Sequence, residues 1–149
     1  MLGDLTDIQI KNLLLSHTVG RIGFIDGNKP FIIPVTYIFD NDVIISQANE
    51  GHKLESMRKN KLVCFQVDML TDPSCWQSVM IGGEFEELHE KDADAAREKL
   101  YDRIFSLHTN AQIHPYGHAV TSIPDDSNRV KKIMYQIKIT DIIGKFEKP

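Results

Sequence analysis

Three runs of β-branched and aromatic residues follow one another early in the chain, with only short turn sequences between them. Residues 19–25, 31–39 and 42–46 are rich in Val, Ile, Phe and Tyr, which favour strands. The intervening residues 26–30 and 40–41 carry Asp, Asn, Gly and Pro, which favour turns. Because such short connections reverse the chain, the three runs predict an antiparallel meander.

The rest of the chain supplies further strands and helices. Alternating or β-favouring runs predict strands, and apolar residues at helical spacing predict helices. The predicted strands cover residues 62–68, 76–88 and 130–143, the helices cover residues 6–15, 51–59 and 92–107, and the longer loops cover residues 69–75 and 108–128. Thr6 and Gln9 form a capping-box pattern for the first helix, and Asp92 is the expected cap of the last. The last strand should be half-buried, because Ile133, Tyr135 and Ile137 alternate with polar residues.

Six strands joined mostly by hairpins predict a mainly β fold with flanking helices. Closure into a small barrel would remove exposed strand edges. The 149 residues suit a single domain spanning residues 1–149. Pro34 cannot donate to a strand ladder, so pairing must be interrupted there by an edge, a bulge or a ligand. The double glycine Gly82-Gly83 suggests a bulge, a bend or a close backbone approach.

Charge and composition argue against several classes of partner. The formal net charge is −4, and no basic block suggests nucleic acid binding. No apolar run approaches the length of a membrane span, and the first residues lack a secretory signal pattern. Cys64 and Cys75 stand outside any CxxC pair. A reduced, cytoplasmic protein with two free thiols is therefore favoured over one with a disulfide.

The junction Gly51-His52-Lys53 follows a predicted strand and opens a predicted helix. The first turn of a helix carries free N–H groups and partial positive charge, which suit an anion. Lys53 adds a full charge, and His52 a second donor. An ordinary solvated helix start is the alternative interpretation of the same residues.

The other residues that suggest ligand binding fit a flat ring joined to a phosphate. A strand interrupted at Pro34 exposes backbone groups, and Trp76 and Ser78 share one face of a strand. Together with Lys53 they indicate a nucleotide-like or flavin-like ligand. His108, His114 and His118 include an i, i+4 pair, but Pro115 opposes a regular helix there, so no metal site is predicted. No side chain is a convincing acid or base, so no catalytic residue is assigned.

Six segments occur in a characteristic order: GRIGF at residues 20–24, PFIIPVTY at 30–37, ANEGHKL at 48–54, VCFQVD at 63–68, WQSV at 76–79 and YQIKI at 135–139. In this order they resemble the flavin-nucleotide-binding members of the pyridoxamine 5′-phosphate oxidase-like split-barrel superfamily. The branch with the nitroimidazole-resistance (nitroimidazole reductase) proteins is the most similar. The resemblance covers nearly the whole chain.

The resemblance implies a six-stranded antiparallel split β-barrel that binds FMN at the interface of a homodimer. It places five consecutive residues along the isoalloxazine ring, largely through backbone groups: Ile33, Pro34, Val35, Thr36 and Tyr37. It further implies that Ser46 and Gln47 approach the ring or ribityl chain, that His52 and Lys53 hold the phosphate, and that Trp76 and Ser78 reach the flavin from the fifth strand.

The implied activity is that of an FMN-dependent oxidoreductase acting on a small, nitroaromatic or other acceptor. The cofactor carries the chemistry in such enzymes, and the protein supplies binding and electrostatics. The alternative is a non-catalytic flavin or haem carrier or sensor, with His108, His114 or His118 as an axial ligand. The deazaflavin cofactor F420 and a barrel that has lost its ligand are further alternatives.

Overall fold

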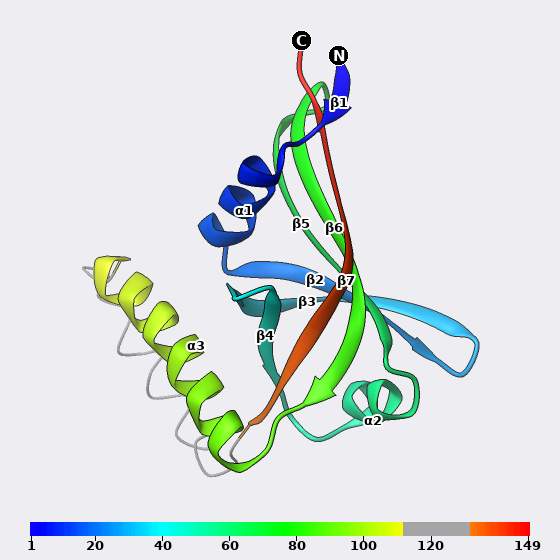
Figure 1. The fold of residues 1–149 in the computed structure, drawn as a ribbon, viewed down its shortest axis with the longest axis vertical. Helices are drawn as coiled ribbons and strands as arrows, with labels where there is room; N and C mark the ends of the chain where they lie inside the picture. Colours follow the sequence, from blue (N-terminus) through cyan, green and yellow to red (C-terminus); the bar gives the residue numbers. More distant parts are fainter. Residues whose placement is uncertain (112–131) are drawn as a thin grey trace.

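The computed structural model describes residues 1–111 and 132–149, and in these the chain forms seven strands and three helices. The strands are β1 (Leu2–Asp4), β2 (Val19–Asp26), β3 (Lys29–Asp40), β4 (Val43–Ala48), β5 (Leu62–Asp72), β6 (Cys75–Glu87) and β7 (Ile133–Glu147). The helices are α1 (Asp7–Ser16), α2 (His52–Lys59) and α3 (Glu90–Ala111). Figure 1 shows how they are arranged.

Strands β2 to β7 form a closed antiparallel ring. The pairing order is β7-β4-β3-β2-β5-β6, and β6 pairs with β7 to complete it. The predicted six-stranded antiparallel barrel with flanking helices is therefore confirmed. The strand β1 was not predicted; it pairs with the end of β7, from Leu2 opposite Glu147 to Asp4 opposite Lys145. Its three residues have no strand pattern in the sequence, and they form a strand because they pair with β7.

Two-residue turns join the meander β2-β3-β4. Gly27 has a φ of 64° between β2 and β3, and Asn41 and Asp42 have φ of 48° and 66° between β3 and β4. Positive φ at these positions gives turns whose twist matches that of the flanking strands. These turns confirm the predicted meander and set its register.

The predicted loop at residues 69–75 was wrong. Strand β5 continues to Asp72 and β6 begins at Cys75, which leaves Pro73 and Ser74 as the turn. The Asp72 side chain accepts a hydrogen bond from the Ser74 N–H at 2.8 Å and stabilises that turn. The error arose because the polar composition of this hairpin reflects its exposure, whereas its strands are made by pairing with each other.

The predicted irregularity at the double glycine is confirmed as a bulge. Gly82 pairs with Asp141 and Gly83 with Ile139, so Thr140 has no partner of its own in the β6–β7 ladder. The Thr140 hydroxyl donates to the Gly82 carbonyl at 3.0 Å. An ideal Cβ on Gly83 would lie 2.4 Å from the Lys138 carbonyl oxygen, so the two strands approach here more closely than a side chain permits.

The helices follow the sequence except at the two ends of α3, which runs from Glu90 to Ala111. The capping box of α1 is confirmed, with Thr6 N–H donating to Gln9 Oε1 at 2.8 Å and Gln9 N–H donating to Thr6 Oγ1 at 3.2 Å. Asp92 is not the cap of α3, which begins at Glu90. The His89 carbonyl accepts the N–H groups of Asp92 and Ala93, so the backbone turns into the helix earlier than the side-chain pattern indicated.

The barrel encloses the main hydrophobic core, which includes Ile22, Tyr37, Leu54, Phe65 and Ile137. A second cluster lies under α3, where Ala93, Ala96 and Leu100 pack with Ile45 and Met134. Strand β7 was predicted to be half-buried, but Met134 on its other face is fully buried. The reason is that α3 covers this part of the sheet.

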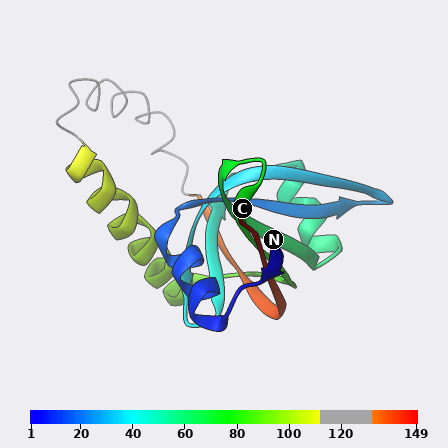
Figure 2. The ribbon, with the colours of Figure 1, turned by 90° about the horizontal axis from the view of Figure 1, so that it is seen from above.

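The three helices of the described residues flank the barrel at different places. Helix α2 lies beneath the β2–β3 hairpin, and α3 runs along the opposite side (Figures 1 and 2). The turn between β5 and β6 lies with both chain ends at the end of the molecule remote from α2 (Figure 1). In the described part of the chain, no helix has the length and apolar character needed to cross a membrane.

Candidate functional site

The barrel is split along one edge of β3. In the described residues, Lys29–Thr36 pair with β2, whereas β4 pairs only with the end of β3, from Tyr37 to Asp40. The edge of β3 between Pro30 and Thr36 that faces away from β2 therefore has no strand beside it in this part of the chain. We refer to it as the open edge of β3.

The backbone groups on the open edge follow from the antiparallel register. Tyr37 N–H donates to the Thr18 carbonyl on the β2 side at 2.8 Å, so the backbone groups of even-numbered residues point to the open edge. Pro30 and Pro34 stand at two of these positions and have no N–H to leave unpaired. Pro34 therefore marks an edge, one of the three options predicted. Prolines at such positions also protect an edge from pairing with another strand.

Ser46 closes one end of the open edge. Its hydroxyl donates to the Thr36 carbonyl at 2.6 Å, at the point where β4 leaves β3. Ser46 is 1% exposed. Ser46 therefore satisfies the Thr36 carbonyl, while the Ile32 and Pro34 carbonyls and the Ile32 and Thr36 N–H groups face outward by the same alternation.

The side chains of this stretch of β3 alternate between the barrel interior and the surface, where Ile32 and Pro34 are exposed. Val35 and Tyr37 are buried, and Ile33 packs against the same core. The Tyr37 hydroxyl donates to the Leu14 carbonyl at 2.6 Å, and burial raises the pKa of Tyr37 well above its usual value. A ligand beside this edge would therefore meet the backbone groups of Ile32, Pro34 and Thr36. Of the predicted residues Ile33 to Tyr37, the odd-numbered ones direct their backbone groups toward β2.

Unsatisfied polar atoms lie close to the split. Gln47 Oε1 and the Tyr135 hydroxyl are buried and have no hydrogen-bond partner in the described residues. Tyr135 lies opposite Ser46 across the β4–β7 pair. Burial raises the pKa of Tyr135 to about 12, and the neighbouring Ser46 hydroxyl partly offsets this rise. The two side chains face opposite sides of this pair, Gln47 with Met134 on the α3 side and Tyr135 in the barrel core. Buried polar atoms without partners are uncommon, and each of the two fits a polar ligand or a bound water.

Helix α2 begins without a side-chain cap. Gly51 is the N-cap and makes no side-chain hydrogen bond, so the first-turn N–H groups have no acceptor from it. Leu54 and Met57 are fully buried in the barrel core and fix the direction of the helix. The N-terminus of α2 therefore presents free donors and the positive end of its dipole.

Two lysines lie at this helix start. Lys53 is half-buried, and burial lowers its pKa, with the charge of Lys132 lowering it further. Lys132 directly precedes β7, whose first residue Ile133 lies opposite Ala48. Two cations that repel each other here favour an anion between them. Lys132 was missed by sequence reasoning, because only the β4–β7 pairing brings it to α2.

His52 is largely exposed and is held by another residue. Its Nε2 lies 2.6 Å from Asp26 Oδ2, at the end of β2. This contact ties the start of α2 to the β2–β3 hairpin. Of the two residues predicted to hold a phosphate, Lys53 is thus without a carboxylate partner among the described contacts, whereas His52 has one.

Trp76 and Ser78 lie elsewhere on the barrel. Trp76 follows the β5–β6 turn, and its Nε1 donates to Glu147 Oε1 at 3.1 Å. Ser78 accepts a hydrogen bond from Gln66 Nε2 at 2.9 Å. Because this turn is at the end remote from α2 (Figure 1), a single chain does not bring Trp76 together with Lys53. The structure thus joins Ser46 to Thr36, ties the start of α2 to the β2–β3 hairpin through His52 and Asp26, and leaves the two β6 residues apart.

The histidines considered for metal or haem are only partly described. The backbone of His108 belongs to α3, beyond the predicted helix end at residue 107. His114 and His118 lie outside the described residues. Among residues 1–111 and 132–149, no group of three or more His, Cys, Asp or Glu residues is arranged to hold a metal ion.

Comparisons with solved structures show the same fold. A FAD-binding protein from Mesorhizobium loti superposes with a TM-score of 0.76 over 99% of each chain, at 21% identity. A candidate 5-nitroimidazole antibiotic resistance protein from Bacteroides thetaiotaomicron gives 0.69 at 18% identity, over 98% of this chain and 87% of that one. A FAD and haem binding protein from Mycobacterium smegmatis gives 0.65 at 12% identity, over 99% and 74%.

Sequence comparison agrees with the structural one. An uncharacterized protein from Rhizobium meliloti is 24% identical over 80 residues, which cover 54% of this chain and 53%, or about half, of that relative. The profile of the family described as pyridoxamine 5′-phosphate oxidase matches residues 7–146. Since this match spans nearly the whole chain and the fold agrees with it, the chain belongs to the pyridoxamine 5′-phosphate oxidase family.

Proposed function

We propose that the protein binds FMN and acts as an oxidoreductase on a small acceptor such as a nitroaromatic compound. The observation that carries the proposal is the pairing of two features beside the split: an open β3 edge of backbone donors and acceptors, and an uncapped α2 start with Lys53. The first suits the polar rim of a flavin ring, and the second suits its phosphate. The bound flavin would supply the hydride or electron transfer.

The residues of this chain would bind and orient that cofactor. Backbone groups of Ile32, Pro34 and Thr36 would meet the ring, and Ser46 keeps the Thr36 carbonyl in place. Gln47, with its unpartnered buried oxygen, would meet the ribityl hydroxyls. Lys53 would bind the phosphate, and its lowered pKa reflects a charge that the phosphate would stabilise.

The structures with similar folds support a flavin without deciding which one. Those from Mesorhizobium loti and Mycobacterium smegmatis are described as FAD-binding, and the one from Bacteroides thetaiotaomicron as a nitroimidazole resistance candidate. We propose FMN because one uncapped helix start beside Lys53 suits a terminal phosphate. Comparing the affinities for FMN and FAD tests this choice.

We also propose that the working form is a homodimer with the cofactor at its interface. The support is the separation of Trp76 and Ser78 from Lys53 within one chain, which a second copy would remove. Exposed apolar residues of β3 and β5 provide a surface: Phe31, Ile32 and Leu62 line a hollow of about 550 Å³ with Cys64. Such a patch is typical of a protein contact.

Leu62→Asp is expected to convert the dimer to monomer, because it puts a charge into this apolar surface at a residue that is 64% exposed in one chain. Light scattering coupled to size-exclusion chromatography measures the mass. Ile8→Asp on α1, an equally exposed apolar position away from the hollow, is the control and should leave the mass unchanged. A wild-type protein that is monomeric at micromolar concentration would contradict the dimer.

The absorption spectrum of the purified protein tests the function directly. We expect the bands of an oxidised flavin, bleaching on addition of NADH or NADPH, and reoxidation by a nitroimidazole. Bleaching with recovery only in oxygen would retain flavin binding but reject the nitroaromatic acceptor. A protein that binds neither FMN nor FAD at micromolar levels would contradict the proposal as a whole.

A second candidate function is a flavin or haem carrier or sensor without turnover. Such a protein would act in the reducing cytoplasm. The observation that favours it is the fold shared with a FAD and haem binding protein, together with the lack of an assigned acid or base near the split in the described residues. Cys64 and Cys75 are free thiols, as expected for a reducing compartment. A Soret band in place of flavin bands would favour this function.

A further inference from the structure

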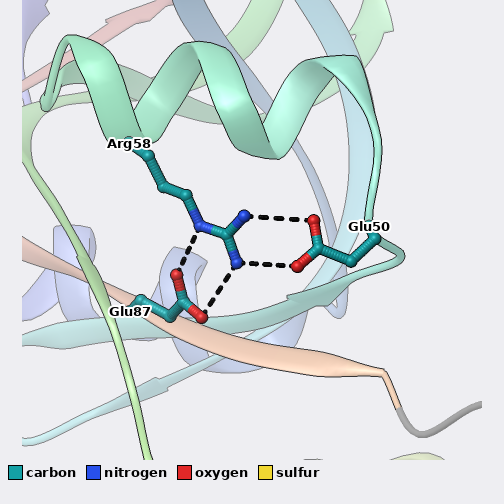
Figure 3. Close-up of polar contacts among 3 residues, drawn as sticks. All are labelled: Glu50, Arg58 and Glu87. Carbon is teal, nitrogen blue, oxygen red and sulfur yellow. Dashed lines mark hydrogen bonds and ion pairs between the residues drawn. The ribbon is translucent and has the colours of Figure 1, made fainter.

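Arg58, in the last turn of α2, lies between two carboxylates from different parts of the chain (Figure 3). Its Nη1 and Nη2 donate to both oxygens of Glu50 at 3.0 and 2.9 Å. Its Nε and Nη2 donate to both oxygens of Glu87, the last residue of β6, at 2.7 and 3.1 Å. The guanidinium therefore holds both carboxylates in two-point contacts, the geometry in which Arg binds carboxylates most specifically.

Glu50 lies close to the N-terminus of α2 in the sequence. Glu50 lies two residues before the start of α2 and directly precedes the N-cap Gly51. A carboxylate there is attracted by the free N–H groups and positive dipole of the helix start. Gly51 has no side chain to occupy those groups, and Lys53 adds a full positive charge nearby.

A Glu50 carboxylate released from Arg58 would compete with a bound phosphate. Both are anions that need the same donors, and the carboxylate is tethered beside them at high effective concentration. Arg58 draws the Glu50 side chain along the helix toward its C-terminal turn (Figure 3). Hydrogen bonds from Arg58 also lower the pKa of Glu87, so Glu87 stays ionised and helps to fix the guanidinium.

We infer that Arg58 is a positioning residue that holds the Glu50 carboxylate away from the N-terminus of α2 and keeps that place free for the phosphate of a flavin nucleotide. The inference rests on the proposed function and adds a role for Arg58, Glu50 and Glu87. In this arrangement the Glu50 carboxylate can compete with the phosphate for the helix start, and Arg58 prevents that competition.

The first test is Arg58→Gln. Release of Glu50 should weaken FMN binding by about tenfold, the size of one charge-assisted contact at a helix start. The affinity for riboflavin, which has no phosphate, should be unchanged. Tryptophan or flavin fluorescence titration measures both, and the melting temperature without ligand records any loss of stability. An equal loss for FMN and riboflavin would overturn the inference in favour of a purely structural role.

The second test adds Glu50→Gln to Arg58→Gln. If Glu50 competes with the phosphate, the double variant should bind FMN within about threefold of the wild type, because the competing charge is gone. If Arg58 only holds α2 in place, removing a second member of the cluster cannot restore binding. Absence of recovery would therefore overturn the inference. Should Arg58→Gln fail to fold, Arg58→Lys, which keeps the charge but not the two-sided contact, takes its place.

The wild-type protein separates this inference from the proposed function. If it binds FMN no more tightly than riboflavin, the phosphate position at α2 is wrong, and the role of Arg58 falls with it. If it prefers FMN but Glu50→Gln does not restore binding in the variant, only the role of Arg58 is wrong. Glu50→Gln alone should bind FMN at least as tightly as the wild type.

Discussion

Lys53→Ala is expected to weaken FMN binding by about 10- to 150-fold. The substitution removes a charge-assisted contact to the phosphate, which contributes roughly 1.5–3 kcal/mol. Lys53 suits this role because it is half-buried at an uncapped helix start and makes no ion pair with a described carboxylate. Isothermal titration or flavin fluorescence gives the two dissociation constants.

Two controls distinguish loss of the phosphate contact from general damage. Riboflavin should bind Lys53→Ala and the wild type equally, because it lacks the phosphate. Lys59→Ala changes an exposed lysine in the last turn of the same helix and should leave FMN affinity unchanged. Equal FMN affinity in Lys53→Ala and the wild type would remove the phosphate assignment at α2.

Removing the Lys53 charge should stabilise the ligand-free protein, although it weakens FMN binding. Burial and Lys132 lower the pKa of Lys53 in the folded state, so the unfolded chain binds this proton more readily. The free energy of unfolding therefore rises as pH increases through the lowered pKa toward the value of an unfolded lysine. Lys53→Met, which removes the charge, should raise the melting temperature of the ligand-free protein at neutral pH and reduce this pH dependence.

Gly83→Ala is expected to destabilise the barrel by about 2–3 kcal/mol, as forced overpacking in a rigid place does. The new Cβ would lie 2.4 Å from the Lys138 carbonyl oxygen and 2.6 Å from Ile137 Cγ2. The first of these is backbone in the adjoining strand β7, which can move only by disturbing the β6–β7 ladder. For a chain of this length the melting temperature should fall by roughly 5–10 °C.

Gly82→Ala in the same bulge provides a matched comparison. Its Cβ would meet Asp141 Oδ1 at 2.4 Å, but this is the end of an exposed side chain that can rotate away. We expect a loss of less than about 1 kcal/mol, typical of a surface change. Calorimetry of the two variants measures the difference. Similar melting temperatures for both would show that the β6–β7 bulge is not the rigid point that the register indicates.

Local patterns in the sequence predicted the barrel well, because hairpin turns and strand composition act over a few residues. The turn before β4, predicted at residues 40–41 and found one residue later at Asn41-Asp42, is of this kind. The Thr6–Gln9 capping box and the Gly82-Gly83 bulge are two further examples. Two of the errors concern features created by distant parts of the chain, whereas the missed hairpin at residues 69–75 and the Asp92 cap are local errors. Strand β1 exists only through β7, and Met134 is buried only because α3 covers it.

The candidate site follows the same division. The Lys53 helix start and the Pro34 edge were visible in the sequence, because each depends on neighbouring residues. Lys132 and the Arg58–Glu87 contact were not, since strand pairing and helix packing bring them together. The alternation of apolar and polar residues in the last strand was the one sequence signal that involved Lys132. This alternation does not reveal which residues of β4 lie opposite the strand.

The closure of the ring by β7 has a consequence for how the protein folds. Strand β7 must pair with both β4 and β6, and β4 is separated from it by more than half of the chain. Until β7 docks, the other barrel strands form an open sheet whose edge strands, β4 and β6, each lack a partner on one side. Such non-local topologies assemble slowly. We therefore expect chaperone dependence or aggregation during synthesis to depend on how fast this last strand arrives.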